Sequence, residues 1–188
     1  MLALTLLFGT SSIEAIVIVF ERRIGSLERL LLAPVRLPAL LAGKLLGGMT
    51  FGLGVTLVVL VISIVVFCFG GINWPMLVLA LLLSATAFSA LGAFVSVAVR
   101  EVFEAQTLAN FIRFPMMFLG GVFVPLASMP VWFQVIARLL PLTYSVEALR
   151  TALSGGAWST AALDLAALAI FSLGLYLLAV SILARRLE

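Results

Sequence analysis

Two long stretches without a charged residue constrain this chain more than any other feature. They cover residues 45–69 and 76–99. Each exceeds the roughly 20 apolar residues that an α-helix needs to cross the hydrocarbon core of a bilayer. In the whole chain 64% of the residues are hydrophobic and 10% are charged, whereas about a quarter of the residues in a soluble domain are charged. The sequence therefore predicts an integral membrane protein.

Three further apolar segments extend this pattern, at residues 1–20, 105–124 and 160–184. The sequence thus predicts an all-α, polytopic membrane helical bundle with five spans, forming a single transmembrane domain over residues 1–188. Residues 125–158 are only partly apolar and contain Pro130 and Pro141. We expect short helices and turns there, at the outer membrane surface and in part re-entrant.

The basic residues lie at the ends of the apolar segments, in the loop Glu21–Lys44, at Arg100 and at Arg185-Arg186. Because cytoplasmic loops carry an excess of Lys and Arg, we expect these three sites to be cytoplasmic and residues 125–158 to face outward. The net charge of +3 is explained in this way without a nucleic-acid partner. This orientation places the N-terminus outside, and nothing at Met1 explains how it crossed the membrane. We therefore expect either that the chain is an N-terminally shortened version of a six-span protein, or that its start codon was assigned too late.

The first cytoplasmic loop has the pattern of an amphipathic helix over about residues 21–33, broken by Pro34 and Pro38. Its apolar face holds Ile24, Leu27 and Leu31, and its charged positions include Glu21, Arg22, Glu28 and Arg29. Such a helix lies in the interface plane with its charged side toward the cytosol. A mixed-sign face suits docking of a soluble protein with complementary charges. A loop that only sets topology remains the alternative.

Two ionisable residues fall inside predicted spans, where charges are costly. For Glu14 we favour a place near an interface over one facing protein. For Arg113 we favour a side chain that extends to the cytoplasmic interface; contact with water, pairing across helices and contact with substrate are the alternatives. Glu147 and Arg150 are three residues apart and could pair.

The start of the second span contains two GxxxG spacings, Gly43/Gly47 and Gly48/Gly52. This spacing permits close approach of helix backbones. We favour packing within the chain over a subunit interface, because the motif is frequent by chance in glycine-rich spans.

The chain has no histidine and one cysteine, Cys68. This composition excludes histidine-based acid–base catalysis, Ser-His triads, histidine metal sites and an intrachain disulfide. We expect no enzyme, and no paired ionisable groups of the kind that secondary transporters bury near the membrane midplane are evident.

Two stretches resemble the signatures of the type-2 ATP-binding-cassette (ABC) exporter permeases. The cytoplasmic signature is matched by Glu21, Arg22, Gly25, Glu28, Pro34, Gly43 and Lys44, with Ser26 where threonine is usual. The outer signature is matched by Gly121, Val122, Phe123, Pro125, Met129, Pro130, Trp132, Pro141, Leu142, Thr143, Tyr144, Glu147 and Arg150. The resemblance covers essentially the whole chain and leaves out the first span of the family.

The resemblance implies a transport subunit in the inner (cytoplasmic) membrane that exports drugs, lipids or lipid-linked polysaccharides. The helix at residues 21–33 would be a coupling helix that docks on a separate ATPase subunit, through Glu21, Arg22, Gly25, Ser26, Glu28, Arg29 and Pro34. The outer helices would form a re-entrant lid that includes Gly121, Pro125, Pro130, Trp132, Pro141, Tyr144, Glu147 and Arg150. A second permease subunit and membrane lipid complete the expected partners.

The sequence has no GxxxxGK[ST] phosphate-binding motif, so we expect no directly bound cofactor, with ATP and Mg on the partner ATPase. The alternative function is a membrane scaffold or assembly factor that docks a soluble partner through the Glu21–Leu32 helix without transport.

Overall fold

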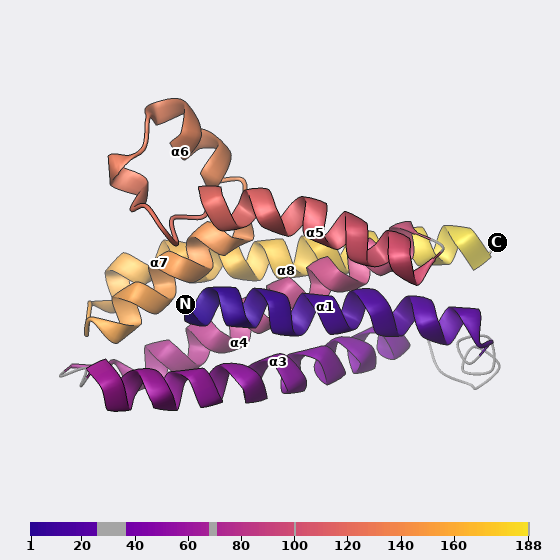
Figure 1. Ribbon diagram of the computed structural model, residues 1–188, viewed down its shortest axis with the longest axis horizontal. Coiled ribbons are helices and arrows are strands. Elements are labelled where there is room, and N and C mark those ends of the chain that lie inside the picture. The colour runs from indigo at the N-terminus through magenta and orange to yellow at the C-terminus, as the bar shows by residue number, and fades with distance from the viewer. Residues whose placement is uncertain (26–36, 68–70, 100, 188) are drawn as a thin grey trace.

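The computed structural model describes residues 1–25, 37–67, 71–99 and 101–187, and within these ranges it is helical without strands. This confirms the predicted all-α bundle (Figure 1). The long helices are α1 (Leu2–Arg23), α3 (Leu37–Phe67), α4 (Trp74–Ala98), α5 (Val102–Leu119) and α8 (Trp158–Leu187). The shorter elements are the 3-10 helix η1 (Leu126–Ser128), α6 (Val131–Ala137) and α7 (Pro141–Leu153).

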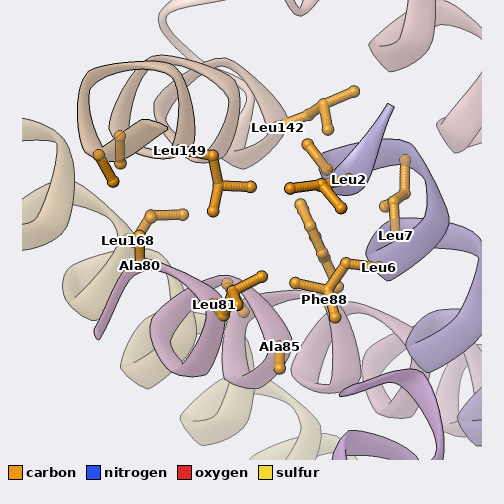
Figure 2. Packing of buried hydrophobic residues seen from close by; sticks show 14 of the residues in the cluster. Leu2, Leu6, Leu7, Ala80, Leu81, Ala85, Phe88, Leu142, Leu149 and Leu168 are labelled. Atoms are coloured by element: carbon orange, nitrogen blue, oxygen red, sulfur yellow. The ribbon is translucent and has the colours of Figure 1, made fainter. Parts of the chain in front are cut away.

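Helix α4 occupies the middle of the bundle and contacts α1, α3, α5, α7 and α8. Most of its side chains are buried, and many of them are alanine or serine. Short side chains let neighbouring helices approach closely, as is usual between membrane helices. Figure 2 shows the main hydrophobic core, in which leucines of α1, α7 and α8 meet Leu81 and Phe88 of α4.

Four of the described helices are long and apolar enough to cross a membrane: α1, α3, α4 and α8. These four correspond to four of the five predicted spans, and the fifth predicted span, at residues 105–124, corresponds to α5. Helix α5 is not among the four, since its 18 residues include Glu104, Gln106, Asn110 and Arg113. It nevertheless lies along α1 and returns to the end of the bundle where α7 lies (Figure 1).

Helix α3 begins at Leu37, about two turns before the predicted start at residue 45. Pro38 lies in the first turn of α3, where a proline removes no helical hydrogen bond; the expected break between residue 33 and this turn lies outside the described residues. Helix α1 extends to Arg23, so Glu21 and Arg22 belong to its last turn. Residues 26–36, which contain most of the expected coupling helix, lie outside the described part of the chain.

Helix α5 begins at Val102, where Glu101 and Glu104 form a capping box, and it continues through Pro115 to Leu119. It begins three residues before the predicted start at residue 105 and ends at Leu119, five residues before the predicted end at residue 124. The short helices predicted within residues 125–158 are also confirmed. Helix α6 lies apart from the bundle in Figure 1, whereas α7 packs into the bundle against α4 and α8.

Glycines allow α1 to approach α3 and α4 closely. A methyl group added at Gly52 of α3 would lie 2.9 Å from the backbone nitrogen of Thr10 in α1. One added at Gly92 of α4 would lie 2.7 Å from the carbonyl oxygen of Ser11. Both atoms belong to the backbone of α1, so neither could move without shifting the helix.

The two GxxxG pairs of α3 differ in their surroundings. Gly48 is buried against the side chain of Glu14, so Gly48 and Gly52 both pack against α1. A methyl group at Gly43 or Gly47 would meet no atom of the described chain. Packing within the chain therefore accounts for the Gly48/Gly52 pair and does not account for the Gly43/Gly47 pair.

These contacts predict different outcomes for alanine substitutions at the glycines of α3 and α4. Gly52→Ala and Gly92→Ala should each lower the free energy of unfolding by about 1–3 kcal/mol, because the added methyl group overpacks a backbone contact. Gly47→Ala is the matched control and should leave the stability unchanged or slightly higher, since the methyl group has free space and alanine favours the helix. Thermal unfolding of the purified protein in detergent measures both. Equal destabilisation by Gly47→Ala and Gly52→Ala would contradict the packing described here.

Candidate functional site

The candidate site lies where the segment at residues 26–36 connects α1 to α3. Glu21 in the last turn of α1 forms an ion pair with Lys44 of α3. Both side chains are partly shielded from solvent. The pair joins α1 to α3 near the two ends of the connecting segment.

Arg22 attaches the same end of α1 to α4. Its Nη1 donates a hydrogen bond of 3.1 Å to the carbonyl oxygen of Val99. Val99 caps the C-terminal end of α4, where backbone carbonyls lack helical partners. Glu21, Lys44, Arg22 and the Val99 carbonyl together form a helix-end clamp that holds α1, α3 and α4.

The helix-end clamp changes the interpretation of two predicted docking residues. Glu21 and Arg22 were expected on the charged face of the coupling helix, but their side chains contact α3 and the end of α4. Gly25 ends α1: its φ is 70°, a conformation that favours glycine, and its N–H donates to the Arg22 carbonyl. Ser26, Glu28, Arg29 and Pro34 lie outside the described residues, so their docking role remains a prediction.

Glu14 lies at the contact of α1, α3 and α4. It is only 2% exposed, and its Oε1 accepts a hydrogen bond of 2.9 Å from the backbone N–H of Gly48. The side chains of Ser89 and Lys44 are the other polar groups that interact with the Glu14 carboxyl group. This confirms the alternative that Glu14 faces protein, whereas its position near an interface stays a prediction. The glycines of α3 and α4 provide the space for this carboxylate.

Arg113 is buried between α5 and α1, with 1% of its surface exposed. It donates to Ser12 Oγ at 2.9 Å and to Asn110 Oδ1 at 3.3 Å. Its guanidinium carbon lies 5.7 Å from the ring centroid of Phe8, within cation–π range. The expected extension to the cytoplasmic interface is therefore wrong. Within the described chain, its Nε and Nη2 have no hydrogen-bond partner.

The outer signature residues divide into two groups. Pro141, Tyr144, Glu147 and Arg150 lie on α7, and Arg150 Nη2 donates at 3.2 Å to the carbonyl of Gly121, whose φ is 74°. The predicted pairing of Arg150 with Glu147 is not formed in the described structure. Tyr144 donates from its hydroxyl to the carbonyl of Arg138 at 2.7 Å.

The second outer group consists of Pro125, Pro130 and Trp132, which lie at η1 and α6. Pro125 precedes η1, and Pro130 precedes the first residue of α6, as its sequence position indicated. Trp132 is exposed, and its ring stacks on Phe133 with the centroids 3.6 Å apart. The two groups are thus parts of different helices, and Gly121 with Arg150 is the contact that ties α7 to the segment after α5.

Sequence reasoning missed several hydroxyl contacts between helices. Ser145 of α7 donates to Ser84 of α4 at 2.7 Å, and Ser89 of α4 donates to the Leu45 carbonyl of α3 at 3.0 Å. Serines in an apolar helix were the available signal, since such side chains hydrogen-bond across membrane helices. Their partners could not be assigned before the helix neighbours were known.

The environment of Arg113 predicts that removing its charge does not destabilise the protein. Arg113→Met keeps an unbranched apolar side chain and removes a buried cation whose donors are only partly satisfied. We expect a free energy of unfolding that is unchanged or raised by up to about 2 kcal/mol. Thermal unfolding in detergent measures this, with the exposed Arg138→Met as the control. A loss of more than about 2 kcal/mol for Arg113→Met alone would show that Arg113 stabilises the bundle.

Comparison with known proteins assigns this sequence to a family. Residues 1–154 match the family described as ABC-2 type transporter. The inner membrane transport permease YadH of Escherichia coli strain K12 is 30% identical over 166 residues, which cover 88% of this chain and 64% of that protein. Nodulation protein J of Sinorhizobium fredii is 34% identical over 125 residues, covering 63% of this chain and 46% of that protein.

A more distant match extends to a eukaryote. ABC transporter G family member 20 of Dictyostelium discoideum is 32% identical over 145 residues, covering 74% of this chain and 19% of that protein. No solved structure matches. The chain spans less than two thirds of the length of these relatives. The profile match over most of the chain shows that the chain belongs to the ABC-2 type transporter family.

Proposed function

We propose that this chain is the permease subunit of an ATP-driven exporter that moves an amphipathic substrate out across the membrane. Family membership and the similarity to a protein named as a transport permease support the transport role. The helix-end clamp is the observation that carries the mechanism, because it joins α1, α3 and α4 beside the segment that resembles the coupling signature. ATP and Mg would bind to a separate ATPase subunit.

The mechanism is mechanical. A partner ATPase that closes on ATP would displace the segment at residues 26–36, with Ser26, Glu28 and Arg29 as the proposed docking residues. The Glu21–Lys44 pair makes α1 and α3 follow this displacement together, and Arg22 extends it to the end of α4. A rigid shift of packed helices between inward and outward states then moves the substrate.

The charge distribution supports the orientation of this exporter. Figure 1 shows the end of α1 and the end of α8 at one end of the bundle, and α7 and the start of α1 toward the other. Arg22 and Arg23 belong to the last turn of α1, Lys44 pairs with Glu21 of the same turn, and Arg185 lies near the end of α8. By the positive-inside bias the first end is cytoplasmic. We place the chain in the inner membrane, with a second permease subunit and lipid around it.

The docking role predicts a separation of ATP hydrolysis from export. Glu28→Lys reverses a charge on the proposed docking face. We expect export to fall at least about tenfold while ATP hydrolysis continues and the variant reaches the membrane in normal amounts. Both activities are measured in lipid vesicles that contain the permease and its proposed partner ATPase. Glu188→Lys introduces the same charge change at the last residue and should export normally.

The result also separates the exporter from the scaffold alternative. Export at the wild-type level by Glu28→Lys would overturn the docking role. An ATPase that binds the wild-type chain without any transport, for any amphiphile tested, would favour the scaffold.

A further inference from the structure

A cavity of about 440 Å³ opens at the end of the bundle opposite the helix-end clamp. It lies between the start of α1, the outer half of α3 and one side of α7, and its lining includes Leu2, Ser63, Val146, Leu149, Arg150 and Ser154. Its volume falls within the range of about 300–1,000 Å³ that is usual for small-molecule sites. The walls are mostly apolar, as in a site for a hydrocarbon chain.

Arg150 is the only ionisable side chain among the described residues that line this cavity. A guanidinium group stays charged at any physiological pH and has several N–H donors in a planar fork. One of these donors is used by the Gly121 carbonyl at 3.2 Å. Glu147 lies one turn earlier on α7, but it neither lines the cavity nor forms an ion pair with Arg150. The cavity therefore presents a cation without a counter-charge beside its apolar walls.

The two serine hydroxyls of the cavity are already engaged as donors. Ser63 donates to the Val59 carbonyl at 2.8 Å, and Ser154 donates to the Thr151 carbonyl at 3.1 Å. Each hydroxyl has a single proton, so neither is available to bind an anion. Among the described side chains that line this cavity, Arg150 is consequently the one that can recognise a charge.

We propose that this cavity binds a single-chain amphiphile with an anionic head, and that such molecules are the substrate class of the exporter. The hydrocarbon chain would lie against Leu2, Val146 and Leu149, and a phosphate, sulfate or carboxylate head would accept hydrogen bonds from Arg150. The substrate assignment depends on the proposed function, whereas the binding site does not.

Binding tests the site without the partner ATPase. The purified chain in nanodiscs of phosphatidylcholine is titrated with dodecyl phosphate, dodecyltrimethylammonium and inorganic phosphate. We expect dodecyl phosphate to bind at least about tenfold more tightly than either of the others, because only it satisfies both the apolar walls and Arg150. Equal binding of the two dodecyl compounds would overturn the proposal.

Variants assign the selectivity to Arg150. Arg150→Gln keeps a donor for the Gly121 carbonyl and loses the charge, so we expect an affinity for dodecyl phosphate at least about tenfold lower. Arg150→Lys keeps the charge and should retain most of the affinity, which separates recognition of charge from a fold defect. Arg138→Gln, on a basic residue that does not line the cavity, is the matched control. An unchanged affinity in Arg150→Gln would overturn the site.

A second measurement distinguishes a substrate from a resident lipid. With the partner ATPase present, dodecyl phosphate should stimulate ATP hydrolysis in the wild type and not in Arg150→Gln. Selective binding without stimulation would identify a lipid site and overturn the substrate assignment. A complex that hydrolyses ATP and exports other amphiphiles would show that the exporter function holds even though this assignment fails.

Discussion

Glycines at positions 52 and 92 let the backbone of α1 approach α3 and α4 more closely than larger side chains would allow, and this approach sets where the polar groups of α1 lie. It places Glu14 against the Gly48 N–H and brings the last turn of α1 beside Lys44 and the end of α4. In a bilayer, apolar contacts between helices gain little over contacts with lipid, so close packing and polar contacts hold the bundle. The helix-end clamp therefore depends on the glycines that lie several turns away.

The bundle combines this tight inner contact with more loosely held outer parts. Helices α1 and α4 are largely buried, whereas α3 and α8 expose most of their apolar side chains to the surroundings. At the outer end, α7 is held by Ser145 and by the Arg150–Gly121 contact, and α6 lies apart from the bundle. The lever that we propose consists of the closely packed helices α1, α3 and α4.

Much of this fold could be predicted from the sequence, because long uncharged runs determine membrane helices and prolines determine where the outer helices begin. The start of α3 could not be predicted, since Pro38 is compatible either with a break in a helix or with the first turn of a new one. The neighbours of Glu14 and Arg113 could not be predicted either. Hydropathy identifies a charged residue that is costly in a membrane span, but it does not show which helix the side chain faces. The same limit applied to Glu21 and Arg22. Their positions in the signature indicated docking, and only the facing ends of α3 and α4 showed that they join helices.

We propose that α1 and α3 move as one unit when the proposed partner ATPase acts. Cysteines at Glu21 and Lys44, with Cys68 replaced by serine, can be joined by a short bis-methanethiosulfonate cross-linker in vesicles that contain the ATPase. The account predicts that cross-linking raises export from the level of the uncross-linked double-cysteine variant toward that of the wild type, since it replaces the lost ion pair. Abolition of export by the cross-link, with recovery on reduction, would show that α1 and α3 must separate and would contradict the account.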